Sequence, residues 1–161
     1  MGDAMNEPIQ FVVFRLDEQR YALPLMVAGR IVRAVEVTPL PDAPAMVLGA
    51  IDVEGRILPV LNLRRRFGLP ERKIRPADQF LIAHMTRRSV VLVVDEAQGV
   101  IACPAAEIIQ PAEIVPGLQQ TQGVVKLADG LLLIHDLDKF FALDEAQALD
   151  EAMKQEATHG K

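Results

Sequence analysis

The side chains that could act as nucleophile or base are few in this chain and far apart. Serine occurs once, at Ser89, directly after Arg87 and Arg88 and outside any catalytic motif. Nucleophilic catalysis needs a hydroxyl or thiol group held beside a base, and the sequence offers no such spacing. Asp95 and Glu96 form an acidic pair, but neighbours on a strand point to opposite faces. The sequence therefore predicts that the protein is not an enzyme.

The groups that could bind a metal are equally dispersed. The histidines are His84, His135 and His159, and none has a second ligand at the spacing of a metal site. Cys103 is the only cysteine, so it forms no disulfide within the chain and no zinc site by itself. We expect no metal and no cofactor, histidines that are packed or on the surface, and a packed thiol.

Charge and hydropathy exclude two further classes of protein. The net charge of −5 argues against a nucleic-acid binder, which carries a strongly basic face. The longest apolar runs, 90–94 and 131–134, are far shorter than the roughly 18 residues of a membrane-spanning helix. The N-terminus lacks the basic and apolar regions of a secretory signal, so we expect a cytoplasmic protein. Basic residues do gather between 64 and 75, without Trp or Tyr among them, and are interpreted as solvated surface.

The hydrophobic pattern has mostly a period of two, which predicts short strands joined by polar turns. Four hairpins are expected: residues 11–16 with 20–25, 51–53 with 56–63, 80–83 with 90–94, and 124–127 with 131–134. Glu54 and Gly55 supply the turn of the second hairpin. The fold class is therefore mainly β.

Helices are expected to be few. A helical stripe predicts one C-terminal helix from Leu137 to about Glu156, with Asp136 capping its start. A short helical turn or loop is expected at residues 27–30. Prolines make residues 38–44 a stiff connector without helix.

The chain also repeats itself. Residues 49–53 match 123–127, Phe67 falls on Phe141, and residues 11–14 pair with 80–83. The same glycine turn, strand and aromatic residue recur in one order, so we infer an internal duplication. Two small β units of this size should share a buried seam.

The segment from Gly49 to Leu69, Gly-Ala-Ile-Asp-Val-Glu-Gly-Arg-Ile-Leu-Pro-Val-Leu-Asn-Leu-Arg-Arg-Arg-Phe-Gly-Leu, resembles the signature of the CheW family of chemotaxis coupling proteins. The connector 38–44, Val93-Val94-Asp95-Glu96 and residues 123–137 are similar to that family too. The resemblance covers about residues 11–143. It implies two SH3-like five-stranded β-barrels within a CheW-like domain at 9–145, followed by an acidic helical tail at 146–161. We expect the first barrel mainly in 20–75 and the second mainly in 78–143, with exchange of the first strand left open.

The resemblance implies a non-catalytic adaptor. It would join the cytoplasmic tips of chemoreceptors to the regulatory domain of a CheA-type histidine kinase, recruited from the cytoplasm to membrane-associated arrays. The same resemblance implies a kinase-facing surface at the second hairpin turn: Asp52, Val53, Glu54, Gly55 and Arg56. Apolar residues flanking the groove between the barrels are candidates for the receptor or, alternatively, ordinary core: Val27, Ile31, Val93 and Val100.

One departure from the family pattern concerns charge. The family usually has an arginine where this chain has Glu54, and often an acid where this chain has Arg30. Our hypothesis is that the two residues face each other, so that an ion pair persists with its polarity reversed. A kinase partner from a non-flagellar chemosensory pathway, such as surface motility or second-messenger control, is the alternative that this exchange leaves open. Another open alternative for the function is a detached regulatory module that acts on a kinase without receptors. The oligomeric state also stays open between a monomer and weak self-association through the barrel edges.

Overall fold

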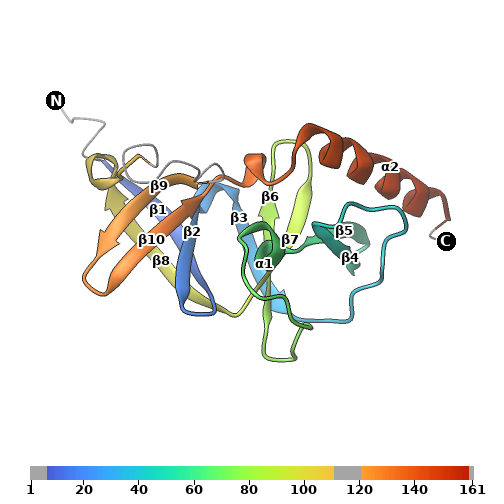
Figure 1. The fold of residues 1–161 in the computed structure, drawn as a ribbon, viewed down its shortest axis with the longest axis horizontal. Helices are drawn as coiled ribbons and strands as arrows, with labels where there is room; N and C mark the ends of the chain where they lie inside the picture. Colours follow the sequence, from blue (N-terminus) through green and yellow to red (C-terminus); the bar gives the residue numbers. More distant parts are fainter. Residues whose placement is uncertain (1–6, 111–120, 160–161) are drawn as a thin grey trace.

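The computed structural model describes residues 7–110 and 121–159 (Figure 1). The described strands are β1 (Pro8–Leu16), β2 (Gln19–Pro24), β3 (Ala28–Arg33), β4 (Val47–Val53), β5 (Arg56–Leu61), β6 (Gln79–His84), β7 (Ser89–Val94), β8 (Glu96–Pro104), β9 (Thr121–Leu127) and β10 (Gly130–His135). The helices are α1 (Leu63–Arg66) and α2 (Leu143–His159), with short 3-10 turns η2 (Leu25–Val27), η3 (Ala105–Glu107) and η5 (Leu137–Lys139).

The strands form two five-stranded sheets with the same internal plan. Barrel A has the strand order β8-β1-β2-β10-β9, and barrel B has the order β3-β6-β7-β5-β4. Each barrel contains one parallel pair, β2 with β10 and β5 with β7, among antiparallel neighbours. The predicted fold class, mainly β with two SH3-like barrels, is confirmed, and so are the four predicted hairpins.

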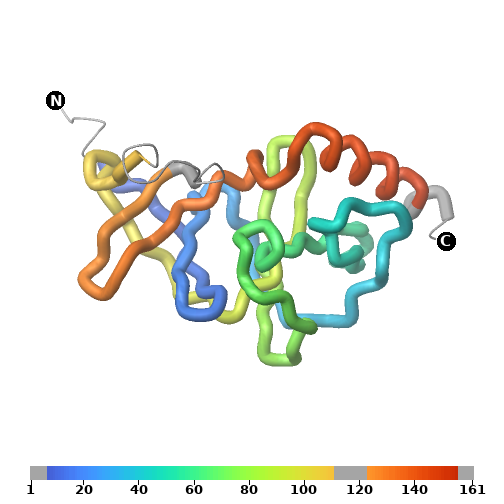
Figure 2. The backbone as a smooth tube through the Cα atoms, viewed as in Figure 1, coloured from blue at the N-terminus to red at the C-terminus, as the bar shows by residue number. Residues whose placement is uncertain are grey.

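The two barrels exchange their first hairpins. Figure 2 shows residues 8–24 in barrel A with residues 96–104 and 121–135, while residues 79–94 lie in barrel B beside residues 28–33 and 47–61. The expected boundaries of the barrels, 20–75 and 78–143, therefore follow the repeats in the sequence. In the structure, each barrel instead contains strands from both repeats. The expected exchange concerned only the first strand. The structure exchanges a whole hairpin from each repeat, because β1 and β2 pair with each other and lie in the same barrel.

Matching glycines mark the closure of each barrel. Single bridges, Thr38 with Ala50 and Ile109 with Val124, join the open edges of the sheets. A Cβ atom at Gly49 would lie 2.2 Å from the Thr38 carbonyl oxygen, and one at Gly123 would lie 2.4 Å from Ile108 Cγ2. Glycine allows the close backbone approach at Gly49 and leaves room for the Ile108 side chain at Gly123, so the matched glycines of the repeat have a physical reason.

The exchanged hairpins form the seam between the barrels. Phe11 and Val13 of β1 face the core of barrel A, while Phe80 and Ile82 of β6 face the core of barrel B. The alternate residues of these strands meet in a shared cluster, as the duplication predicted. Its buried members are Val12, Phe14, Leu16, Tyr21, Leu23, Leu61, Leu63, Leu81, Ala83, Val90, Leu92, Val94, Leu137 and Phe140.

Two predicted local structures were wrong. The C-terminal helix begins at Leu143, because Leu137 and Phe140 turn into the seam and interrupt the helical path. Asp136 makes no capping hydrogen bond, and the Ala142 N–H instead donates to Glu145 Oε1 at 2.8 Å.

The second error concerns residues 27–30, expected as a helical turn or loop. The 3-10 turn η2 ends at Val27, and residues 28–33 form the edge strand β3 paired with β6. The corresponding edge strand β8 was also not predicted. Both edge strands are largely exposed, so they lack the apolar alternation of a buried strand.

Candidate functional site

The β4–β5 hairpin turn presents the predicted kinase-facing residues on the surface of barrel B. Glu54 and Gly55 both have positive φ, 52° and 87°, as a two-residue hairpin loop requires. Asp52 Oδ1 accepts a hydrogen bond from the Gly55 N–H at 2.7 Å, which fixes the turn. Glu54 and Arg56 are exposed beside it, so the turn is a rigid platform with charged side chains outward.

The predicted contact between Arg30 and Glu54 is present. Arg30 Nη1 of β3 lies 3.0 Å from Glu54 Oε1, and the two side chains are 52% and 74% exposed. An ion pair this exposed contributes only about 0–1 kcal/mol to stability. Its effect is therefore local: it orders the turn and fixes the pattern of charge on this part of the surface.

Sequence reasoning missed two polar residues beside the same platform. The Arg56 guanidinium donates to Ser89 Oγ at 3.3 Å, and His84 Nδ1 lies 2.9 Å from that oxygen. His84 Nε2 is also close to Gly29, where an added Cβ would stand 3.2 Å away. Ser89 and His84, a hydroxyl and a base that the sequence suggested to be far apart, thus lie within hydrogen-bond distance of each other on the polar surface around the hairpin turn.

Ile31 and Val100, two of the four receptor candidates, occupy equivalent places on the two edge strands. Ile31 of β3 pairs with Leu81, and Val100 of β8 pairs with Val12. Directly opposed residues of antiparallel strands project to the same face, and Leu81 and Val12 both face the seam. Ile31 (44% exposed) and Val100 (53% exposed) therefore mark the rim of the seam on either barrel.

The other two receptor candidates, Val27 and Val93, pack against different parts of the protein. Val27 packs against the seam cluster at the start of β3, consistent with a place at the rim. Val93 instead packs against the core of barrel B, so its side chain serves that core. Met26, which sequence reasoning did not single out, is 88% exposed on η2 next to Val27. Its exposure adds a large apolar side chain to the surface beside the rim.

A cluster of buried charges crosses the seam where β7 ends. The Asp95 side chain is 4% exposed, against 56% for Glu96, so this pair points to opposite faces as predicted. Arg64 Nη2 donates to Asp95 Oδ1 at 2.9 Å and to Asp17 Oδ1 at 2.8 Å. Arg72 Nη2 donates to Asp95 Oδ1 at 2.7 Å. The cluster ties the β1–β2 turn to α1 and to the loop before β6.

The Asp95 and Asp78 carboxylates stay ionised. Burial by itself raises the pKa of Asp95, but hydrogen bonds from Arg64 and the Asp17 N–H, with the charges of Arg64 and Arg72, bring its pKa below the usual value. Burial acts in the same direction on Asp78, and hydrogen bonds from Arg72 and the Arg75 N–H likewise leave its pKa lowered. The cluster therefore has a structural role at neutral pH.

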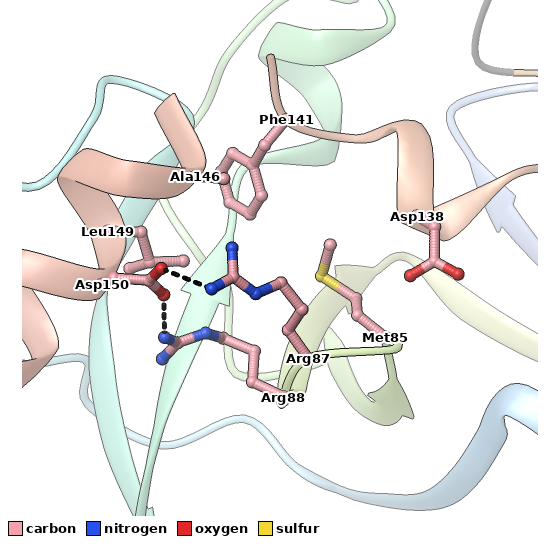
Figure 3. A pocket seen from close by; sticks show the side chains of 8 residues that line it. All are labelled: Met85, Arg87, Arg88, Asp138, Phe141, Ala146, Leu149 and Asp150. Carbon is pink, nitrogen blue, oxygen red and sulfur yellow. Dashed lines mark hydrogen bonds and ion pairs between the residues drawn. The ribbon is translucent and has the colours of Figure 1, made fainter. Parts of the chain in front are cut away.

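Helix α2 packs on barrel B and borders a small, partly open pocket of about 90 Å³. Figure 3 shows Arg87 and Arg88 of the β6–β7 turn both directed at Asp150, with Phe141 on the opposite wall. The guanidinium groups are held by the helix, and Leu149 is buried beside them. The pocket is thus part of the contact that fastens α2 to the barrel.

The remaining candidates for chemistry are distributed over the fold. His135 is buried, and its ring makes edge contacts with Phe67 and Phe140. Burial raises the pKa of the Cys103 thiol, and the nearby Glu107 carboxylate raises it further. Within residues 7–110 and 121–159, no three His, Cys, Asp or Glu side chains gather as a metal site would require. None of the helices in the same ranges combines the length and the hydropathy that a bilayer crossing needs.

Two small barrels with a common seam, a rigid charged turn and exposed apolar edge residues define a protein-binding scaffold. The family model for the CheW-like domain matches residues 10–145. The chain therefore belongs to the CheW-like family, and it is a scaffold or adaptor of the chemotaxis type.

Curated relatives and a solved structure agree with this assignment. The chain is 30% identical over 150 residues to the chemotaxis protein CheW of Treponema pallidum (strain Nichols), covering 89% of this chain and 88% of that protein. It is 29% identical over 121 residues to the protein FrzA of Myxococcus xanthus, covering 71% and 76%. The crystal structure of the scaffolding protein TtCheW from Thermoanaerobacter tengcongensis matches with a TM-score of 0.77 and 27% identity, over 86% of this chain and 95% of that one.

Proposed function

We propose that this protein couples the cytoplasmic tips of chemoreceptors to the regulatory domain of a CheA-type histidine kinase, without catalysing a reaction. In this role it is cytoplasmic, is recruited to membrane-associated receptor arrays, and is a monomer or associates only weakly with itself. Its working unit is the CheW-like domain at 9–145, and residues 146–161 are an acidic tail. The proposal rests on the family and on two distinct surfaces, one charged and one apolar.

The observation that carries the receptor contact is the pair of apolar residues at the seam rim. Ile31 and Val100 lie at corresponding positions of the two repeats, and each remains about half exposed. A helical hairpin presents apolar side chains at helical spacing, which can pack along such a rim. Val27 and the exposed Met26 extend the apolar surface from β3 onto η2.

The kinase contact is assigned to the β4–β5 turn, from Asp52 to Arg56. The fixed turn supplies a preorganised surface, so little conformational entropy is lost on binding. Arg30 and Glu54 supply the charge pattern by which a partner is selected.

Titration calorimetry with a purified CheA-type regulatory domain tests the charged surface. Glu54→Arg places two cations together and should weaken kinase binding, and adding Arg30→Glu should restore part of the affinity. Glu107→Arg, an equal change of charge on η3 in barrel A, is the control and should bind as the wild type does. Additive effects of the two substitutions would show that Arg30 and Glu54 do not act as a pair.

Capture of receptor cytoplasmic fragments tests the apolar rim. Ile31→Asp or Val100→Asp should lower receptor affinity about tenfold or more while leaving kinase binding intact. Leu131→Asp, at a residue 45% exposed on β10, is the matched control. Capture of neither kinase nor receptor by the wild-type protein would refute the coupling function, and capture of the kinase alone would favour a regulatory module without receptors.

The reversed polarity of the Arg30–Glu54 pair favours a second candidate function. A scaffold in a non-flagellar chemosensory pathway, for surface motility or second-messenger control, would have its own kinase with a complementary charge pattern. Comparing kinases from both kinds of pathway in one titration series separates the candidates, because the cognate kinase should lose the most affinity on Glu54→Arg.

A further inference from the structure

The basic segment between residues 64 and 75 is mostly neutralised within the fold. Its charges were interpreted from the sequence as solvated surface, but five of its six cations lie within ion-pair distance of carboxylates of the chain itself. These five are Arg64, Arg65, Arg66, Arg72 and Arg75. Arg64 and Arg72 belong to the buried charge cluster around Asp95. Arg66 Nη2 lies 2.6 Å from Glu145 Oε1 of α2. The ion pairs of Arg64, Arg66 and Arg72 therefore stabilise the fold.

Lys73 and Arg75 are different. Arg75 is 55% exposed and lies 3.5 Å from Asp78, whose oxygens are already occupied by Arg72. Lys73 is exposed and forms no ion pair in the part of the chain that the structure describes. Lys73, and the exposed Arg75 that shares its carboxylate with Arg72, can thus interact with a partner on the surface of a protein whose net charge is −5.

These two cations border an open groove of about 510 Å³ at one end of barrel B. The segment between β3 and β4 forms one wall, and the loop before β6 forms the other. Ala34, Val37 and Ile74 line the groove and also pack against the core of barrel B, so its floor is continuous with that core. Val35 and Leu48 line it with 52% and 39% of their surface exposed.

We propose that this groove binds an acidic segment of a partner protein that carries an apolar anchor residue. The anchor occupies the apolar floor between Val35, Leu48 and Ile74, and flanking carboxylates pair with Lys73 and Arg75. One carboxylate, Glu36, also lines the groove and repels acids placed next to it, so the acidic residues of the segment lie beside Lys73 and Arg75. Charge complementarity therefore identifies the occupant by its chemistry.

The groove is separate from the surfaces assigned to the kinase and the receptor. Neither the hairpin turn at 52–56 with Arg30 nor the rim residues Ile31 and Val100 lines it. An anionic membrane is a poorer occupant, because the site is concave and the protein as a whole is acidic. The proposal consequently stands or falls independently of the coupling function.

Fluorescence polarisation of the full-length protein with labelled peptides tests the groove. The probe is Asp-Glu-Leu-Asp-Glu-Phe-Glu-Asp, compared with versions that replace Leu and Phe by Ser, or every acid by Lys. Only the acidic probe with its apolar residues should bind saturably. Lys73→Glu with Arg75→Glu should weaken that binding at least tenfold, and Val35→Ser with Leu48→Ser should do the same.

The matched control is Lys126→Glu with Lys139→Glu, an equal reversal of charge at exposed residues outside the groove. It should bind the probe as the wild type does, and each variant is first shown to retain the wild-type urea midpoint. No saturable binding of the acidic probe up to about 1 mM would overturn the proposal. So would binding unaffected by the groove variants. Adsorption to phosphatidylglycerol vesicles or self-association that depends on Lys73 and Arg75, without peptide binding, would assign the groove to a membrane or to a second copy instead.

Discussion

Removing the Asp95 carboxylate should test whether the buried charges hold the two barrels together. Asp95 accepts hydrogen bonds from Arg64, Arg72 and the Asp17 N–H, and its side chain is 4% exposed. Deleting one partner of a buried ion pair costs about 3–5 kcal/mol, because the remaining charge stays buried without compensation. Arg64 keeps Asp17 and Arg72 keeps Asp78 in the variant. We therefore expect Asp95→Ala to lower the free energy of unfolding by about 3 kcal/mol, at the low end of that range.

Urea unfolding followed by circular dichroism measures this change. Glu96→Ala is the matched control, since Glu96 is the next residue, is 56% exposed, lies 3.7 Å from Arg15 and accepts a hydrogen bond from Gln98 Nε2 at 3.3 Å. It should cost less than about 1 kcal/mol. If the two substitutions lowered the free energy of unfolding equally, the buried charges around Asp95 would not stabilise the fold, and the reasoning would be refuted.

The pH dependence provides a second measurement on the same cluster. The pKa values of Asp95 and Asp78 are lowered in the folded protein from 3.8, the value of an ordinary Asp. A lowered pKa stabilises the fold above the unfolded value, and that stability is lost as the pH falls through the folded value. Below about pH 4, the free energy of unfolding should therefore fall more steeply for the wild type than for Asp95→Asn. Parallel curves would contradict the ionised state of Asp95.

Three further predictions concern single residues. Gly49→Ala should destabilise the protein by about 3 kcal/mol, because its Cβ would meet the Thr38 carbonyl oxygen. Gly55→Ala, with no atom within 4 Å of the added Cβ, should cost much less, and equal urea midpoints would contradict the closure argument. Burial, with the Asp17 carboxylate, raises the pKa of Tyr21 to about 12, so the ultraviolet titration of this only tyrosine should shift from near 10 in guanidinium to near 12 in the native state. A native midpoint near 10 would exclude the buried phenol. The buried Cys103 thiol should react slowly with Ellman's reagent until the protein is unfolded, and rapid native labelling would show that barrel A is open at that strand.

The sequence predicted the local structure well where both faces of a strand are apolar or a turn is well marked. Phe11, Val13, Phe80 and Ile82 alternate with the seam residues, so the hairpins and the shared seam could be predicted. The contact between Arg30 and Glu54 could be predicted only through the family resemblance, since no local pattern links a residue of β3 to the next hairpin turn.

The wrong predictions have one origin, which is long-range packing. Residues 28–33 and 96–104 carry few buried side chains, and they become strands only because β6 and β1 offer them hydrogen-bonding partners. The C-terminal helix starts six residues later than predicted, since Leu137 and Phe140 gain more by burial in the seam than by continuing a helix.

By itself, then, the amino-acid sequence determined the four hairpins with their turns, the repeat and the family. Tertiary structure alone decided which barrel each hairpin joins, because β1 and β6 are apolar on both faces and either sheet could bury them equally well. It also decided the roles of the charges. Asp95 and Lys73 are both charged residues next to strands or loops, yet one is buried between two arginines and the other borders an open groove. Burial and neighbouring charge depend on residues distant in the chain, and only the folded barrels bring those residues together.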